Sequence, residues 1–423
     1  MQDQRRRQFL GLLAASSAGA IAGCGGGTGS ENTDTERGTG AASPQSATDS
    51  GAGGFDVDTS VGLDSWPSLA ANAANTGTGP DETGPTENVS QRWSANTDGI
   101  VASSPAVVNG VLYVGSGDYE SETGTLYAFS AADGSDVWQF DTEHQIYSSP
   151  AVADGTVYIG TGWNGGPGRL YALSASDGTE EWQFEPGMVL YSPTVEDGTV
   201  YVVPSDQTLY ALDADDGSEQ WTFQPDSDLS SSPTVADGTV YVGAGYSNLL
   251  AVDAADGTAQ WEFGTSGGVD AAPAVVDGTV YFGDNSGSVY AVDAADGSEL
   301  WQFGEPSGVY SSPAVRDGTV YVGDGGTYGT SGSTLYALDA DDGTEQWRFE
   351  GTDSFAASPA VTADTVYAGD YLGVVYGIAA ADGTERWRYE TNNNYMETAP
   401  AVADGTVYTG THGNSVYALH ESS

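Results

Sequence analysis

The chain alternates short β-rich runs with two-residue turn signals, and residues 231–264 show this pattern clearly. Asp237-Gly238 separates the first two runs of this segment, and Asp256-Gly257 separates the last two. Two residues of this type between strands favour a type I′ hairpin, because both central positions need a positive φ. We therefore predict four antiparallel strands, named A to D in chain order. They cover residues 231–236, 239–245, 248–254 and 258–264.

This unit recurs along the chain, and a tryptophan marks each predicted strand D. The tryptophans are Trp93, Trp138, Trp182, Trp221, Trp261, Trp301, Trp347 and Trp387. A period of about 40 residues with four strands per repeat is typical of a β-propeller blade. Pro233 stands near the start of strand A, and proline is tolerated on an edge strand. That position suits the inner strand, which lines the channel of a propeller.

The proline of strand A appears eight times, so the chain holds eight repeats. These prolines are Pro105, Pro150, Pro193, Pro233, Pro273, Pro313, Pro359 and Pro400. The last repeat has no strand D, whereas Trp93 precedes the first strand A. We therefore expect residues 91–93 to supply the fourth strand of the last blade, which closes the ring and removes exposed sheet edges. The predicted fold is all-β, an eight-bladed β-propeller with four-stranded antiparallel blades.

The segment Ala211-x-Asp213-x-x-x-Gly217-x-x-x-Trp221 resembles the tryptophan-docking motif of the pyrroloquinoline-quinone (PQQ)-like propellers. The motif recurs in full three times, is looser in the first two repeats, and departs in the seventh, where Gly377 and Ala379 replace alanine and aspartate. An entry segment at residues 65–67 and 75–77 strengthens the resemblance, which covers roughly residues 64–420. In this family the indole lies between an alanine and a glycine peptide of neighbouring motifs, so the resemblance implies blade-to-blade locking.

The family contains quinoprotein dehydrogenases and non-catalytic scaffolds, notably the BamB-type propeller lipoprotein of bacterial outer-membrane β-barrel assembly. The eight-bladed quinoprotein alcohol dehydrogenases place a disulfide of adjacent cysteines over the cofactor. Here the only cysteine is Cys24, outside the propeller, and the calcium-binding Glu/Asn/Asp set of the family does not map onto this chain. The resemblance therefore favours the scaffold branch. We predict no catalytic, cofactor-binding or metal-binding residues, and keep PQQ with calcium as the alternative.

The charge of the chain narrows the partner classes. Sixty acidic residues accompany ten arginines and no lysine, for a formal net charge of −50. Such self-repulsion is screened in brine, so we expect a halophilic protein whose carboxylates keep it solvated, with cation binding as the other interpretation. A nucleic-acid-binding protein would need a basic patch, and none is present.

The N-terminus carries signals for export and anchoring. Arg6-Arg7-Gln8-Phe9-Leu10 matches the twin-arginine export pattern, and Ile21-Ala22-Gly23-Cys24 resembles a lipobox. We predict a signal peptide at residues 1–23, lipidation of Cys24, a disordered tether at 24–60 and the propeller at 61–423. The alternative is a plain secretory signal with an incidental cysteine.

A binding site is expected where the repeats differ, on the face that holds the B-to-C and D-to-A loops. Three long B-to-C loops add Tyr119, Trp163 and Tyr328. The position three residues before each strand A proline, named the mouth position, also varies. Its occupants are Ala102, Tyr147, Leu190, Ser230, Asp270, Tyr310, Ala356 and Glu397. The candidate ligand face thus comprises Tyr119, Tyr147, Trp163, Asp270, Tyr310, Tyr328 and Glu397, and Asp270 and Glu397 could also hold a cation or a polar ligand.

These observations predict a lipid-anchored, extracytoplasmic, monomeric propeller that binds a protein or peptide at the cell surface and catalyses nothing. A PQQ-dependent oxidoreductase with an atypical cofactor site is the main alternative. A surface glycan-binding protein is the other, because exposed aromatic side chains stack on sugars.

Overall fold

The computed structural model divides the chain into two units, Met1–Phe55 and Asp56–Ser423. It describes only residues of the second unit: 66, 68, 71–79, 83–118, 122–162, 167–245, 247–304, 308–325, 333–392 and 395–422. The predicted signal peptide, Cys24 and the tether lie outside these residues, as do Tyr119, Trp163 and Tyr328. Within the described part of the chain, no helix has the length and apolar character that a membrane span requires.

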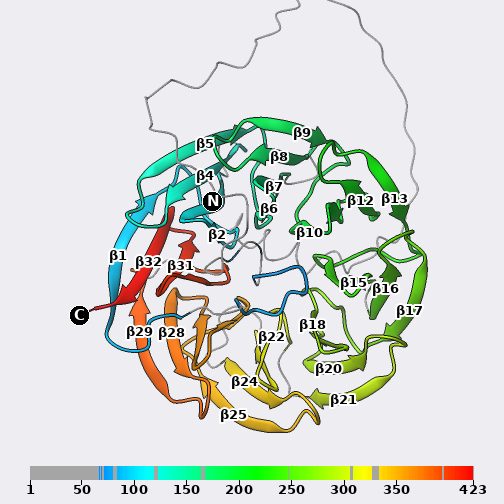
Figure 1. Ribbon diagram of the computed structural model, residues 1–423. Helices are drawn as coiled ribbons and strands as arrows, with labels where there is room; N and C mark the ends of the chain where they lie inside the picture. Colours follow the sequence, from blue (N-terminus) through cyan, green and yellow to red (C-terminus); the bar gives the residue numbers. More distant parts are fainter. Residues whose placement is uncertain are drawn as a thin grey trace, which may run out of the picture. The chain divides into compact units, whose positions relative to one another are not determined.

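Among the described residues, the strands form eight four-stranded antiparallel sheets arranged as blades around a centre (Figure 1). This confirms the predicted eight-bladed propeller. In each blade strand A lies innermost and strand D outermost, as β6 and β9 illustrate. The alternation of apolar residues explains the packing, because successive side chains of a strand point to opposite faces and each face meets a neighbouring blade.

The blades follow the chain from blade 1 to blade 8. Their strands are β2 (Ala106–Val108), β3 (Val111–Gly117), β4 (Gly124–Ser130) and β5 (Asp136–Thr142) in blade 1; β6 (Ala151–Ala153), β7 (Thr156–Gly160), β8 (Leu170–Ser174) and β9 (Glu180–Phe184) in blade 2; β10 (Thr194–Glu196), β11 (Thr199–Val202), β12 (Leu209–Asp213) and β13 (Glu219–Phe223) in blade 3; β14 (Thr234–Ala236), β15 (Thr239–Ala244), β16 (Asn248–Asp253) and β17 (Ala259–Gly264) in blade 4. The later blades consist of β18 (Ala274–Val276), β19 (Thr279–Gly283), β20 (Ser288–Asp293) and β21 (Glu299–Gly304) in blade 5; β22 (Ala314–Arg316), β23 (Thr319–Gly323), β24 (Thr334–Asp339) and β25 (Glu345–Glu350) in blade 6; β26 (Ala360–Val361), β27 (Thr365–Gly369), β28 (Val374–Ala379) and β29 (Glu385–Glu390) in blade 7; β30 (Ala401–Ala403), β31 (Thr406–Thr411), β32 (Ser415–Glu421) and β1 (Val89–Asn96) in blade 8.

Ring closure occurs as predicted. β1 pairs with β32 in antiparallel register, with Ser94 opposite Tyr417, and a bulge lies between Gln91 and Trp93. The first described strand of the chain thereby becomes the outermost strand of the last blade (Figure 1). Closure pairs strands from the two ends of the propeller instead of leaving their edges exposed.

The two turns of each blade differ more than the sequence suggested. In the A-to-B turn of blade 4, Asp237 and Gly238 have φ values of 48° and 76°, which fits the expected type I′ hairpin. In the C-to-D turn only Gly257 has a positive φ, and its N–H donates to the carbonyl of Asp253, so this loop is wider. Strand A is also shorter than expected, because Pro233 has no N–H to donate.

A uniform layer of tryptophans locks each blade to the next. The indole N–H of Trp261 in blade 4 donates to the carbonyl of Ala294 in blade 5 at 2.9 Å. The Tyr241 ring stands 5.8 Å from that indole, and its hydroxyl reaches the same carbonyl at 3.5 Å. A methyl group on Gly297 would come within 2.7 Å of the indole. The glycine contact confirms what the family resemblance implied, whereas the tyrosine was not anticipated.

The junction between blades 7 and 8 uses a different acceptor. Blade 8 takes its strand D from β1, so it has no C-to-D turn to offer. Trp387 and Tyr367 instead donate to the carbonyl of Pro85, at 2.9 and 3.3 Å. Gly377, which departs from the motif, belongs to β28 of blade 7. A methyl group at Gly377 would come within 2.2 Å of the Trp387 indole.

The segment before β1 crosses the inner ends of the blades. The carbonyls of Ala73, Ala74, Thr76 and Gly77 accept hydrogen bonds from strand A amides of blades 4, 5, 6 and 7. Trp66 exchanges two backbone hydrogen bonds with Val107 of blade 1. This segment therefore satisfies inner-edge amides that would otherwise lack a strand partner.

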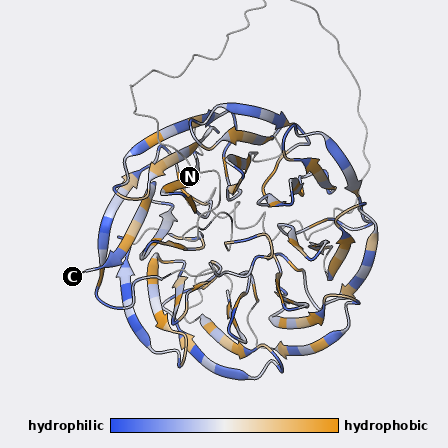
Figure 2. Cartoon of the chain, in the orientation of Figure 1, coloured by the Kyte–Doolittle hydropathy of each residue, from blue (hydrophilic) through white to orange (hydrophobic). Residues whose placement is uncertain are grey.

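Hydropathy follows the layers of each blade (Figure 2). The outermost strands are mostly polar, and β21 for example alternates exposed residues with the buried Trp301. The middle strands are nearly all buried, and the apolar clusters join side chains of adjacent blades. The propeller is therefore a rigid support for the loops at its rim.

Candidate functional site: the mouth of the propeller

The loops of the B-to-C and D-to-A face are held to one another by a repeated backbone hydrogen bond. The N–H of Asn285 donates to Gly268, that of Gly325 to Gly308, and that of His412 to Tyr395, at 2.8–2.9 Å. In each case the B-to-C loop of a blade donates to the D-to-A loop that leads into the same blade. The mouth position, two residues after the acceptor, is thereby placed beside the B-to-C donor, and the two residues form a pair of side chains wherever the donor is not glycine.

Asp270 and Asn285 form such a pair in blade 5. The Asn285 amide accepts from the N–H of Gly268 at 3.0 Å and donates to Oδ2 of Asp270 at 3.3 Å. Asp270 is partly buried, and desolvation raises the pKa of its carboxyl although the Asn285 hydrogen bond opposes the shift. Its Oδ1 accepts no hydrogen bond from the described residues. The pair therefore fixes a carboxylate at the mouth and leaves one oxygen available.

Tyr310 lies next to this carboxylate in blade 6. Its side chain is 42% exposed, and its ring packs over the backbone of Gly308 and Gly325, where a methyl group would come within 2.8 and 3.3 Å of it. Burial raises the pKa of Tyr310, and the charge of Asp270 raises it further. Burial and the charges of Asp270 and Asp228 also raise the pKa of Tyr191, which comes from the start of blade 3. Tyr310 is therefore the aromatic neighbour of the Asp270–Asn285 pair, since a methyl group on Gly308 would meet both the Tyr310 ring and the Asn285 carbonyl.

Glu397 and His412 form the pair of blade 8. Oε2 of Glu397 lies 3.1 Å from Nε2 of His412, and both side chains are mostly buried. Oε1 of Glu397 is buried without a hydrogen-bond partner among the described residues. Asp270 and Glu397 therefore each have a partner in their own blade, and a ligand shared by the two carboxylates stays a prediction.

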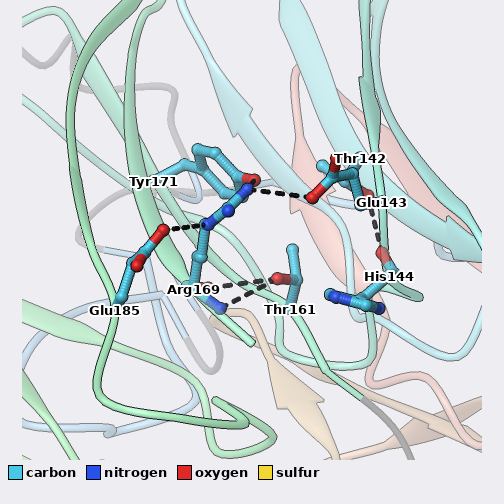
Figure 3. A network of polar contacts seen from close by, with 7 residues as sticks. All are labelled: Thr142, Glu143, His144, Thr161, Arg169, Tyr171 and Glu185. Carbon is cyan, nitrogen blue, oxygen red and sulfur yellow. Dashed lines mark hydrogen bonds and ion pairs between the residues drawn. The ribbon is translucent and has the colours of Figure 1, made fainter. Parts of the chain in front are cut away.

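Tyr147 lies in the sector of blades 1 and 2, where ion pairs brace the loops (Figure 3). Arg169 contacts Glu143 at 3.2 Å, Glu185 at 2.7 Å and the Tyr171 hydroxyl at 3.1 Å. Because Glu143 belongs to the D-to-A loop and Arg169 to the B-to-C loop, this network holds the two loops together. Nearby Gln145 is fully buried and donates to the carbonyl of Asp118 at 2.8 Å. Tyr147 itself is partly buried and belongs to the rim.

Several mouth residues were missed from the sequence, although a signal for them exists. Asn285, Tyr371 and His412 stand 15 residues after their mouth positions, and this spacing holds in every blade. Tyr371 packs against Tyr395 with ring centroids 4.8 Å apart, and the next residue, Leu372, is 43% exposed. Aligning the repeats at an offset of 15 would have found these residues.

The family comparison decides what kind of propeller this is. The model of the family described as outer membrane protein assembly factor BamB matches residues 122–263, 224–332 and 331–423. These ranges cover more than half of the chain. The chain belongs to this family. Its membership confirms the resemblance to PQQ-like propellers, while no curated protein matches.

Solved structures of low identity share the family fold. BamB from Moraxella catarrhalis is 20% identical with a TM-score of 0.64, over 78% of this chain and 99% of that chain. The quinohemoprotein alcohol dehydrogenase from Comamonas testosteroni is 16% identical with a TM-score of 0.68, over 84% and 80%. A europium-containing methanol dehydrogenase is 14% identical with a TM-score of 0.69, over 85% and 98%. BamB and dehydrogenases therefore share the fold of this family member.

A PQQ molecule at the mouth would need cationic partners, because PQQ is a tricarboxylate. Asp270 and Glu397 supply negative charge there, and the chain has no lysine. Among the described arginines, Arg169 lies on this face, where it is paired with Glu143 and Glu185. The others contact groups elsewhere: Arg92, Arg316, Arg348, Arg386 and Arg388. Among the described residues, no group of three or more His, Cys, Asp or Glu side chains could hold a metal ion. A PQQ molecule next to Asp270 and Glu397 would therefore depend on a bound cation to offset the negative charges.

Proposed function

We propose that this protein is a lipid-anchored propeller of the cell surface that binds a protein or peptide partner at its mouth without catalysis. The observation that carries the proposal is the set of exposed and partly exposed side chains on rigid loops there. Tyr310, Tyr371, Leu372 and Tyr395 combine aromatic and apolar surface, and Asp270 adds a charge. The family name supports a role in assembly, since it describes an assembly factor.

Aromatic side chains suit this role because they provide large contact areas while losing few rotatable bonds. Tyrosine is enriched at protein interfaces and among the residues that dominate binding energy. The loop hydrogen bonds of the mouth also lower the entropy that binding must remove, since the loops are ordered before the partner arrives. A partner with an extended or loop segment would fit a rim whose side chains differ from blade to blade.

The N-terminal signals support an extracytoplasmic location. Arg6 and Arg7 would direct export of the folded propeller, and Cys24 would carry the lipid. We expect the wild type to fractionate with membranes and Cys24→Ala to be released into the soluble fraction after export. A Cys24→Ala protein that stays with the membranes would overturn the anchor. We also propose that the propeller acts as a monomer in high salt, with a halophilic surface.

The binding role can be tested by comparing the two faces of the propeller. Tyr310→Ala and Leu372→Ala remove exposed surface at the mouth, whereas Asp277→Asn alters an A-to-B turn on the opposite face and keeps its positive φ. We expect the partner polypeptide to be recovered with wild type and Asp277→Asn, but several-fold less with the mouth variants. Equal recovery with all four proteins would contradict the proposal.

The oxidoreductase alternative rests on the dehydrogenase fold neighbours, and calorimetry separates it from the scaffold. The full chain is titrated with PQQ and calcium in multimolar salt. The scaffold proposal predicts neither heat of binding nor a spectral shift, whereas saturable binding with a shift would favour the oxidoreductase. The glycan-binding alternative depends on Tyr119 and Trp163, and loss of polysaccharide retention after their replacement by alanine would favour it.

A further inference from the structure

Asp270 differs from the other sheltered carboxylates of the mouth face. Asp284 accepts hydrogen bonds from the Tyr290 hydroxyl and from loop amides, and Asp370 accepts from the Tyr376 hydroxyl and the Val374 amide. Glu397 lies 3.1 Å from His412, and its other oxygen is buried without a hydrogen-bond partner among the described residues. Asp284 and Asp370 thus brace their own loops. Asp270 instead receives only the long Asn285 hydrogen bond, so its charge is not balanced by the protein.

The surroundings of Asp270 suit a cation. Tyr310 stands beside the Asp270–Asn285 pair, because a methyl group on Gly308 would come within 2.8 Å of its ring and within 2.7 Å of the Asn285 carbonyl. Aromatic ring faces attract cations. Asn285 orients the carboxylate through Oδ2, which leaves Oδ1 as the acceptor. The Tyr310 ring is held over Gly308 and Gly325, so its position is set before a ligand binds.

We propose that Asp270, held by Asn285 and next to Tyr310, receives the cationic side chain of an arginine or lysine presented by the partner polypeptide. This inference rests on the proposed function and names the chemistry of its partner. Charge complementarity supports a polypeptide as the occupant, because a chain with a net charge of −50 attracts basic segments. The tyrosines and Leu372 would then contact the residues that flank the cation.

The partial burial of Asp270 explains how this carboxylate, one of sixty acidic residues, could bind a cationic side chain in brine in preference to the exposed carboxylates. At 1 M salt the Debye length is about 3 Å, so fully exposed carboxylates attract basic segments weakly. A partly buried carboxylate in direct contact with its partner is screened much less. Asp270 is such a group, whereas Asp277 in the same blade stands on the opposite, exposed turn.

The test uses the full chain and an acetylated, amidated pentapeptide, Gly-Gly-Xaa-Gly-Gly, in 1–3 M KCl. Xaa is arginine or its neutral isostere citrulline, and dissociation constants come from titrations followed by the NMR signals of the peptide. We expect the arginine peptide to bind wild type at least ten-fold more tightly than the citrulline peptide. Asp270→Asn should reduce this ratio to within about two-fold, while Asp277→Asn should keep it. Tyr310→Leu should weaken arginine binding more than Tyr310→Phe.

Equal binding of both peptides to wild type, or the same loss of preference in Asp277→Asn, would overturn this inference. The recovery of the partner polypeptide, measured also with Asp270→Asn, separates failure of this inference from failure of the proposed function. If recovery depends on Tyr310 and Leu372 but not on Asp270, the scaffold stands and the cation receptor falls. A parallel titration with spermidine, expected to bind at least ten-fold more weakly than the arginine peptide, distinguishes a free polyamine from a polypeptide. Tighter binding of spermidine would contradict a polypeptide source.

Discussion

The tryptophan layer and the mouth are both repeated around the ring, but only the first is uniform, apart from the junction between blades 7 and 8. In the layer, tryptophans of successive blades donate to an equivalent carbonyl at 2.8–2.9 Å. At the mouth, the side-chain pairs change from blade to blade, from Asp270 with Asn285 to Glu397 with His412. The backbone hydrogen bonds beneath the mouth remain the same. The ring therefore separates a part that maintains the fold from a part that is free to vary for binding.

The largest loss of stability is expected from the layer. Trp301 is 7% exposed and its indole donates to Ala340 at 2.8 Å. Trp301→Ala should lower the free energy of unfolding by about 3–5 kcal/mol, because it leaves a cavity and removes the indole N–H that donates to the carbonyl of Ala340. The neighbouring Leu300 is 52% exposed, so Leu300→Ala should change the free energy of unfolding by less than about 0.5 kcal/mol. Denaturant titration at fixed salt measures both, and similar losses would contradict the layer's role.

The next largest effect separates backbone strain from contact with the indole. Gly278 and Gly297 both have a positive φ, at 76° and 71°. A methyl group on Gly278 meets nothing within 4 Å, whereas one on Gly297 would come within 2.7 Å of Trp261. Gly278→Ala should cost about 1 kcal/mol from strain alone. Gly297→Ala should cost about 1–3 kcal/mol more because the indole must move.

That difference is measured by denaturant titration of the two variants under identical salt conditions. Equal costs would mean that the indole does not depend on the glycine, and the interblade contact would then be incidental.

A smaller effect tests the closing junction. Tyr367→Phe removes the hydroxyl donor to Pro85 and should cost about 0.5–1.5 kcal/mol. Because the Pro85 segment also provides the Thr83 carbonyl that accepts from Gly405, amide exchange at Gly405 should become faster. Tyr281→Phe removes the equivalent donor between blades 5 and 6, and serves as the control. It should cost a similar amount and leave Gly405 unchanged, so faster exchange in both variants would argue against a local closure.

The smallest effect on stability is expected at the mouth. The pKa of Asp270 is raised in the folded protein, so the folded state binds more protons than the unfolded state between the two pKa values. Stability contributed by this group therefore falls as the pH rises through that window. Asp270→Asn should leave the protein equally or slightly more stable at neutral pH, with the difference vanishing below the unfolded pKa. Thermal unfolding across pH 3–7 checks this, and a loss of stability at neutral pH would show that the carboxylate braces the fold.

The fold could be predicted almost completely from the sequence, because each repeat carries the same turn residues and the same tryptophan. The acceptor at the junction between blades 7 and 8 was not predicted. Pro85 stands before the first repeat, so no repeated sequence signal indicates that its carbonyl takes the place that the carbonyl of Ala294 has between blades 4 and 5. The mouth could be predicted only in part. Asp270 and Tyr310 stood out because their neighbours along the chain are uniform. Asn285 carries a signal only in its offset of 15 residues from Asp270, and its role depends on the hydrogen bond between the two loops.

The most direct test of the account is a scan with a photo-reactive phenylalanine in the native host. The residue is placed singly at mouth positions such as Asp270 and Tyr310, and at turn positions of the opposite face such as Asp237 and Asp277. Because the layer supports both faces equally and only the mouth varies, we predict that one polypeptide is cross-linked from the mouth positions and none from the turns. Cross-linking from the turns, or from neither face, would contradict the claim that binding resides where the repeats differ.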